Sequence, residues 1–345
     1  MFKKILLGSC LALSSLSAWA NLPYFPIQFP RDEAAHQADT PYPVSTLSEW
    51  WYYNGKLTST NGRHFGCYLS FNRYQLDFNG TKIAVPRFEI QITDIDNKVV
   101  YGTAVIPQAS DTEFSTSELK ITFSKDIALQ KNQNTYEINV SVPSKQGPEL
   151  QLTLHLTPTR DVLLVNKNGL GDMWSGTNSY YYSQTHLNTT GTMAIGNEKL
   201  TLDENNSLSW MDHQWGDFII IPGINQWTWS SIQLDNGLEI NLDVVLDPTD
   251  PKSKKPLHSD ASIVMPDGNH IYTHNVQITP HLDPSYKHPL RYSIEIPEIN
   301  LQLELNSYVP GQDVNGISEG ISEATGLFQG QAVKGHAYAE STVDN

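Results

Sequence analysis

The stretch LEINLDVVL, from Leu238 to Leu246, is the clearest guide to the fold because its side chains alternate in character. The apolar members are Leu238, Ile240, Leu242, Val244 and Leu246, and the polar members between them are Glu239, Asn241 and Asp243. Successive side chains of a strand point to opposite faces, so the stretch predicts a strand with one apolar and one polar face. The sequence leaves open whether the face that carries Asp243 turns inward, into a cavity, or outward, into solvent.

The same period of two recurs along the chain, at residues 88–92, 136–142, 152–156 and 299–305. Hairpin turns are indicated by Asn61-Gly62, Asn79-Gly80, Asn236-Gly237 and Asp267-Gly268. Residues 317–328 are the one candidate for an amphipathic helix, and Gly320 and Gly326 disfavour it. Many short strands with turns at this spacing predict an all-β protein, either a sandwich or a barrel.

The first twenty residues have the layout of a secretory signal peptide. Lys3 and Lys4 precede an apolar run, and Ala18-Trp19-Ala20 is a small-x-small cleavage site. A weaker alternative is a lipoprotein acylated at Cys10. We therefore expect export to the periplasm or the cell exterior, with Asn21 as the mature N-terminus and no transmembrane segment.

Composition limits the partners and the domain count of the mature chain. Removal of residues 1–20, with Lys3 and Lys4, leaves 325 residues and changes the formal charge from −15 to −17. The negative charge argues against nucleic acids and anionic membranes as partners, because both bind basic patches. Cys67 is then the sole cysteine, so no intramolecular disulfide forms. The oligomeric state is not readable.

The length suggests two domains after a proline-rich lead. We place that lead at residues 21–44 and expect it to lie extended across the surface. The domain boundaries are then 45–216 and 217–345, two units of comparable size, each a plausible closed or near-closed barrel.

Aromatic residues cluster beside a few ionisable ones, which is typical of an apolar ligand cavity in a barrel. We take as candidate ligand-binding residues Trp50, Trp51, Tyr53, Tyr181, Trp227 and Trp229. The alternative is that these rings fill the core or pack between the domains.

The segment SLSWMDHQWGDF contains the ionisable residues that are the strongest candidates for a catalytic role. Strand alternation places His213 on one face with Met211 and Trp215, and Asp212 on the other. A semi-apolar setting would lower the pKa of His213. The alternative is a core histidine bonded to a backbone group.

A histidine series, His270, His274, His281 and His288, could bind a metal ion in principle. We interpret it instead as an exposed loop cluster, because no carboxylate or cysteine completes a ligand set in the sequence. No metal site is expected.

Several segments resemble one family, the secreted AttH-like and carotenoid 1,2-hydratase (hydroxyneurosporene synthase) group. They are FPRDEAAHQADTPYPVSTLSEWWYYNGKL from Phe29, SYYYSQTHLNTTGTM from Ser179, WMDHQWG from Trp210, WTWSSIQLDNG from Trp227 and, more weakly, GHAYAE from Gly335. They span almost the whole mature chain, and EWWYY and MDHQWG are the most specific.

The resemblance implies two lipocalin-like β-barrel domains in tandem and no metal or organic cofactor. It also implies a catalytic site made by His213 and Trp215 of the D-H-x-W-G motif and by a later aspartate, for which Asp243 is the best match. The family pattern has an aromatic residue two positions before that aspartate, where this chain has Asn241.

If the chain is a hydratase, Asp243 would protonate a C=C bond of an isoprenoid or polyene-like substrate, and His213 would order the attacking water. Tryptophan and tyrosine faces would stabilise the carbocation. Two other classes stay open: a non-catalytic carrier of a lipid or apolar metabolite, and a structural exported interaction protein. A fold shared with an enzyme does not establish a reaction.

Overall fold

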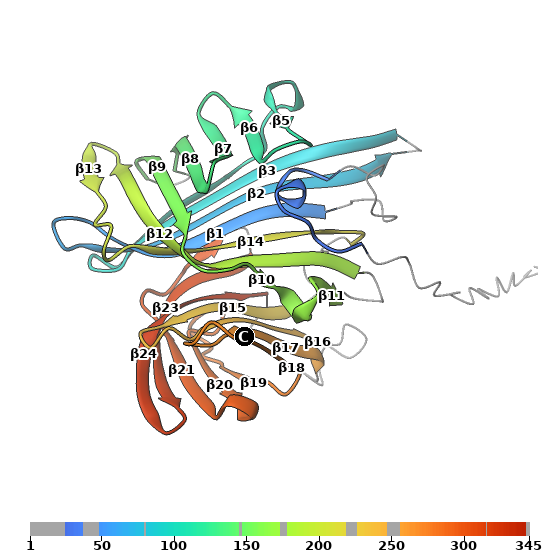
Figure 1. The fold of residues 1–345 in the computed structure, drawn as a ribbon. Coiled ribbons are helices and arrows are strands. Elements are labelled where there is room, and N and C mark those ends of the chain that lie inside the picture. Colours follow the sequence, from blue (N-terminus) through green and yellow to red (C-terminus); the bar gives the residue numbers. More distant parts are fainter. Residues whose placement is uncertain are drawn as a thin grey trace, which may run out of the picture.

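The computed structural model describes residues 25–36, 48–78, 81–144, 147–172, 178–218, 226–246, 256–314 and 316–342. Within them the chain forms two curled antiparallel β-sheets (Figure 1), as expected for lipocalin-like, all-β domains. The predicted signal peptide, Cys10 and the Asn79-Gly80 turn lie outside the described residues.

Fourteen strands make up the first sheet and ten the second. The first contains β1 (Ser48–Thr58), β2 (His64–Phe78), β3 (Thr81–Asp94), β4 (Val99–Val105), β5 (Glu113–Phe114), β6 (Lys120–Ser124), β7 (Ile127–Asn132), β8 (Thr135–Pro143), β9 (Glu149–Pro158), β10 (Leu163–Leu164), β11 (Leu170–Asp172), β12 (Asn178–Ile195), β13 (Glu198–Thr201) and β14 (Leu208–Gly216). The second contains β15 (Trp227–Leu234), β16 (Glu239–Leu246), β17 (Pro256–Val264), β18 (His270–Thr273), β19 (Gln277–His281), β20 (Arg291–Ile296), β21 (Leu301–Ser307), β22 (Asp313–Val314), β23 (Ile317–Phe328) and β24 (Gln331–Ser341).

Helix is confined, in the described residues, to the short 3-10 turns η1 (Arg31–Glu33), η2 (Ala109–Asp111), η3 (Val165–Lys167) and η5 (Pro297–Ile299). None of these has the length or the apolar character needed to span a bilayer.

In each half of the chain the first strand pairs with the last. In the first sheet the order is β4-β3-β2-β1-β14-β12-β9-β8-β7-β6-β5, with β10, β11 and β13 beside β12. In the second it is β18-β17-β16-β15-β24-β23-β21-β20-β19, with β22 beside β23. The chain changes sheet between Gly216 and Trp227, so β1 and β14 lie together in one sheet, and β15 and β24 in the other.

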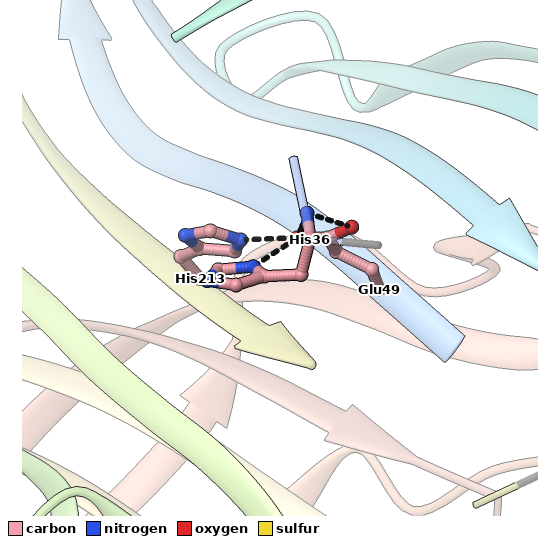
Figure 2. A group of neighbouring side chains, drawn as sticks. All are labelled: His36, Glu49 and His213. Atoms are coloured by element: carbon pink, nitrogen blue, oxygen red, sulfur yellow. Dashed lines mark hydrogen bonds and ion pairs between the residues drawn. The ribbon is translucent and has the colours of Figure 1, made fainter. Parts of the chain in front are cut away.

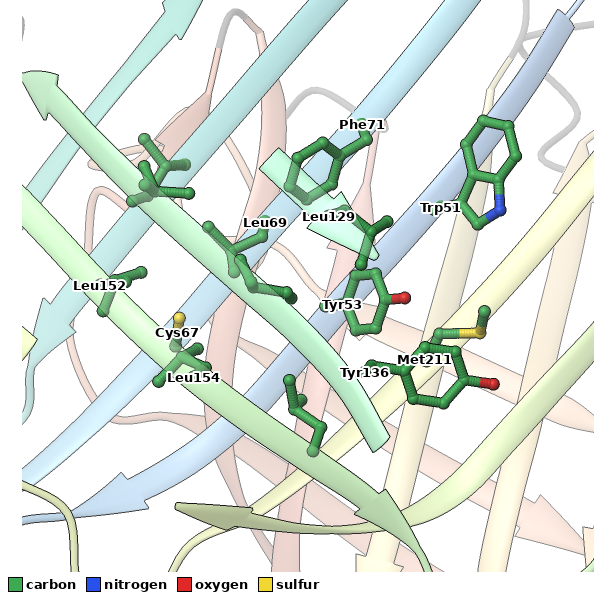
Figure 3. Close-up of a cluster of buried hydrophobic side chains, with 14 of the residues drawn as sticks. Trp51, Tyr53, Cys67, Leu69, Phe71, Leu129, Tyr136, Leu152, Leu154 and Met211 are labelled. Atoms are coloured by element: carbon green, nitrogen blue, oxygen red, sulfur yellow. The ribbon is translucent and has the colours of Figure 1, made fainter. Parts of the chain in front are cut away.

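Each sheet curls around its own apolar core, filled by alternate side chains of its strands. Trp51, Tyr53 and Met211 point into the first core (Figure 3). Ile240 and Leu242 of β16 point into the second. The period of two in the sequence is therefore the period at which side chains enter these cores.

A third apolar cluster lies between the two sheets and includes Tyr52, Tyr68, Trp210 and Trp229. Strands that contribute to this interface are buried on both faces. On β16, Glu239 is 1% exposed and Asn241 is 2% exposed, opposite the leucine face. The polar face of LEINLDVVL thus turns inward, toward the other sheet.

The prediction that the proline-rich lead lies across the surface is wrong for residues 32–36, whereas residues 25–31 are exposed or half-buried. Residues 32–36 are buried against the first sheet. The carbonyl of Glu33 accepts a hydrogen bond from the Trp51 indole, its carboxylate pairs with Lys131, and the His36 ring bonds Glu49. These polar contacts hold residues 32–36 against the first sheet.

Residues 317–328 form strand β23 rather than a helix. Its backbone pairs with β21 on one side and β24 on the other. Hydrogen bonding along both edges decides the conformation of this glycine-containing segment.

Candidate active site

A partly open cavity lies between the two sheets. The lining residues are Trp50, Tyr52, Tyr68, Ser70, Asn72, Tyr74, Glu89, Val165, Asn166, Gly171, Tyr181, Asp212, Gln214, Trp227, Trp229, Asp243, Val245, Asp260, Ile317, Glu319 and Glu340. This set combines aromatic rings with six carboxyl groups and includes no lysine or arginine.

Strand register in the first sheet explains one wall of the cavity. Ser183, Asp212, Tyr52, Ser70 and Glu89 are direct neighbours across β12, β14, β1, β2 and β3. Directly paired residues of antiparallel strands point to the same face. The row therefore presents one surface to the second sheet.

A matching row crosses the second sheet. Glu319, Glu340, Trp229, Asp243 and Asp260 are direct neighbours across β23, β24, β15, β16 and β17. All five line the cavity. The two rows, contributed by ten strands far apart in the sequence, form its opposing walls.

Asp243 presents a carboxyl group to this cavity, with 27% of its side chain exposed. His258 Nε2 lies 3.1 Å from Asp243 Oδ2 and 4.0 Å from Asp260 Oδ2. Burial raises the pKa of Asp243 more than the hydrogen bond and charge of His258 lower it. Asp243 therefore keeps its proton to a higher pH than an exposed aspartate does, and a histidine lies within proton-transfer distance.

The carboxyl group of Asp212, in contrast, is held in place by three hydrogen-bond donors. Tyr181 Oη and Ser183 Oγ each lie 2.6 Å from it, and Trp210 Nε1 lies 2.7 Å away. Burial raises the pKa of Asp212 to about 6 despite these bonds. The Tyr181 hydroxyl in turn accepts from Asn241, at 2.7 Å, so this network fixes the wall of the cavity beside Asp243.

His213 and Trp215 lie on the other side of β14, in the first core. Glu49 Oε1 lies 3.1 Å from His213 Nε2 and 2.7 Å from His36 Nδ1 (Figure 2). Tyr182 Oη lies 3.2 Å from His213 Nδ1. Both ring nitrogens of His213 are thus engaged by side chains, and burial lowers the pKa of this histidine to about 4 against the opposing effect of Glu49.

Ring stacking encloses these two residues further. His213 stacks on Trp51 at 4.5 Å between ring centres, and Trp215 stacks on His36 at 4.0 Å. The structure therefore does not bring His213 and Trp215 together with Asp243, and the expectation that all three face one cavity is wrong. The pleat of β14 separates them, since Asp212 and Gln214 take the cavity side.

The predicted aromatic set divides in the same way. Trp50, Tyr181, Trp227 and Trp229 line the cavity. Trp51 and Tyr53 point instead into the first core, because alternate residues of β1 face opposite sides (Figure 3). The expectation that these two rings face the same cavity as the others is wrong.

Among the described residues, two groups place three possible metal-ligating atoms within 4.8 Å of one another: His36, Glu49 and His213, and Asp243, His258 and Asp260. In the first, Glu49 is satisfied by both rings and by Arg73 at 2.6 Å, a cation that disfavours a second one. Although burial alone would raise the pKa of Glu49, Arg73 and His36 lower it to about 2. In the second, the bond between His258 and Asp243 engages the atoms that a metal ion would need.

The four histidines of the predicted loop cluster have separate partners. His274 contacts Asp260, His281 Nε2 bonds Ser293 at 2.7 Å, and His288 Nε2 lies 3.0 Å from Asp313. The expectation that no carboxylate accompanies these histidines is wrong for His274 and His288. Carboxylates come from neighbouring strands and loops, which a search along the sequence does not detect.

The sequence analysis missed most carboxyl groups of the cavity, namely Glu89, Asp212, Asp260, Glu319 and Glu340, and also missed His258 beside Asp243. One signal was available, because His258 and Asp260 are two apart on a strand and so share a face. The others depend on strand register, which one sequence does not reveal.

Comparison with known proteins gives related chains and folds. A model of the AttH-like family matches residues 21–342. The dehydratase asqC of Emericella nidulans is 25% identical over 232 residues, which are 61% of this chain and 61% of that protein. This chain thus aligns with less than two thirds of that relative.

Two crystal structures share the fold. A putative AttH from Nitrosomonas europaea has a TM-score of 0.75 and 19% identity, covering 93% of this chain and 97% of that one. Kievitone hydratase from Nectria haematococca has a TM-score of 0.70 and 15% identity, covering 92% and 98%.

Proposed function

This chain belongs to the AttH-like family, and from that premise we propose that it is a hydratase or dehydratase acting on an apolar small molecule. The related proteins named a dehydratase and a hydratase support this reaction type. Addition and loss of water are one reaction in two directions, so the same groups serve both. The cavity between the sheets is the proposed site.

The observation that carries the proposal is the Asp243 carboxyl group, which faces an aromatic cavity and bonds His258. Water addition to an unactivated alkene needs a strong proton donor, and loss of water needs one to protonate the leaving hydroxyl. A carboxyl group whose pKa burial has raised is suited to this task.

In the dehydration direction, Asp243 donates its proton to the substrate hydroxyl. The C–O bond then breaks, water departs, and the substrate becomes a carbocation. The Asp243 carboxylate then removes a proton from the adjacent carbon, the electrons of that C–H bond form the C=C bond, and Asp243 is protonated again. His258, 3.1 Å from Asp243, positions this carboxyl group. Hydration is the reverse sequence, so protons balance over one turnover.

The surrounding wall stabilises the cation. Trp227, Trp229 and Trp50 line the cavity, and a desolvated aromatic face contributes about 2 kcal/mol to the binding of a cation. The Asp212 and Tyr181 network holds this wall rigid. In this proposal His213 is a positioning residue, because it bonds Glu49 and Tyr182 on the opposite side of β14.

The test is Asp243→Asn, assayed with acyclic terpene alkenes and tertiary alcohols in ¹⁸O-labelled water. We expect the wild-type protein to change substrate mass by one water molecule, and the variant to lose at least about a hundredfold in rate. Asp126→Asn, in an exposed turn of the first sheet, is the matched control.

Binding of the same compounds separates the alternatives. Retained binding with lost turnover in Asp243→Asn supports an acid role. Tight binding by the wild type without any turnover contradicts the enzyme and favours a carrier of an apolar metabolite.

A further inference from the structure

One end of the cavity carries two glutamates side by side. Glu319 of β23 and Glu340 of β24 are a cross-strand pair, so their side chains point to the same face, and both line the cavity. Tyr52 Oη donates to Glu319 at 2.9 Å, and the Trp227 indole donates to Glu340. Burial and the like charge of its neighbour favour a proton on at least one of these carboxyl groups.

No cation among the lining residues neutralises this pair. The groups facing it are Glu89, Tyr52, Tyr68, Tyr74 and Asp212 from the first sheet, and Asp243 from its own sheet. Glu89 is paired with Arg87, which is not among the lining residues. Burial and the neighbouring carboxyl groups raise the pKa of Glu319 well above its ordinary value, and burial raises that of Glu340 to about 7.

We infer that the cavity selects a neutral ligand with a carbonyl or hydroxyl oxygen, which accepts a hydrogen bond from the protonated Glu319–Glu340 pair. The inference rests on the proposed function, because it assigns the reacting carbon to the Asp243 end of the same cavity. It excludes carboxylates and phosphates, since an anion would meet six carboxyl groups and no lining lysine or arginine.

The strand order also sets the length of this ligand. Glu340, Trp229 and Asp243 are consecutive in one row across β24, β15 and β16. Neighbouring strands are about 4.8 Å apart, so the two acidic ends lie about 10 Å from each other. Trp229 lies between them and offers an apolar surface to the intervening carbon chain.

Four ten-carbon probes test the inference: geranial, which only accepts hydrogen bonds, geraniol, ionised geranate, and myrcene, which has no oxygen. Quenching of Trp50, Trp227 and Trp229 fluorescence reports binding, because these rings line the cavity. At pH 7 we expect geranial and geraniol to bind at least about tenfold more tightly than geranate.

The pH dependence identifies the donor. As the pH rises from 6 to 8.5 Glu340 loses its proton and competes with the ligand for the proton of Glu319, so geranial affinity falls roughly tenfold while myrcene affinity stays constant. Glu340→Gln keeps a donor that does not titrate, so geranial binding becomes independent of pH. Glu304→Gln, on the half-exposed face of β21, keeps the wild-type dependence.

Two results would overturn the inference: geranate binding as tightly as geranial at pH 7, or a wild-type pH dependence in both Glu340→Gln and Glu319→Gln. Circular dichroism shows whether each variant folds, and either glutamine variant suffices. Asp243→Asn separates this inference from the reaction. It retains the pH-dependent binding of geranial even if no turnover is ever found.

Discussion

Asp212 and His213 are adjacent in sequence, yet their side chains belong to two different environments on opposite sides of β14. Asp212 lies on the cavity side, where Tyr181 and Ser183 bond it. His213 lies in the first core, where it bonds Glu49. One short motif thus serves the cavity wall and the barrel core at once.

Replacement of His213 by alanine should destabilise the protein more than it alters the chemistry. The substitution removes a ring bonded to both Glu49 and Tyr182 and leaves Glu49 short of a partner in the core. We expect the free energy of unfolding to fall by about 3 kcal/mol in urea titrations. His64→Ala, with a 44% exposed side chain, should change it by less than about 0.5 kcal/mol. An unchanged midpoint in His213→Ala would contradict the structural role.

The free energy of unfolding of the protein should depend on pH through the buried carboxyl group of Glu340. Burial raises its folded-state pKa to about 7, above its ordinary value of 4.5. A raised carboxyl pKa contributes stability below the ordinary value, and this contribution is lost as the pH rises from 4.5 through 7. Glu340→Gln should therefore be more stable than the wild type at pH 8 by about 1 kcal/mol or more, relative to their difference at pH 5. Parallel pH profiles of the two proteins would refute this.

Gly191 should tolerate no side chain. Its φ is +131°, and a Cβ there would lie 2.0 Å from the Thr153 carbonyl oxygen of the paired strand. We expect Gly191→Ala to lower the free energy of unfolding by about 2 kcal/mol or more. Gly62 also has a positive φ, but its added Cβ would have open space, so Gly62→Ala should cost only about 1 kcal/mol. Equal effects in urea titrations would show that the close approach at Gly191 is unimportant.

Export is a proposal that mass spectrometry can test directly. A chain expressed from Met1 in a Gram-negative host should appear in the periplasmic fraction or the medium with Asn21 at its N-terminus. Lys3→Glu with Lys4→Glu should slow processing, because the signal peptide loses its positive region. A lipid-modified Cys10 at the N-terminus would replace this proposal with membrane anchoring.

Much of the fold was predictable because it depends on local alternation. The period of two in residues 238–246 predicts a strand, and its leucine face does enter a core. That pattern could not show that Glu239 and Asn241 are buried as well, because burial of the polar face depends on the other sheet. For the same reason residues 317–328 were ambiguous until their pairing with β21 and β24 was known.

The candidate site was only partly predictable. Asp243 was found from the family resemblance together with its position opposite the leucine stripe. The separation of Asp243 from His213 was not, because it depends on which side of β14 meets the second sheet. The pairing of Glu319 with Glu340 depends on register between strands, and a single sequence carries no direct record of register.

Both sheets contribute walls to the cavity, so neither half of the chain contains a complete binding site. A ligand that contacts both walls also stabilises the association of the two halves. By mass action, the free energy that it gains from binding both walls together adds to the affinity of the halves for each other. If the chain were cut between Gly216 and Trp227, the two fragments should therefore reassemble more tightly with ligand than without it. Selection for a ligand that fits is, in such a molecule, also selection for keeping its two halves joined.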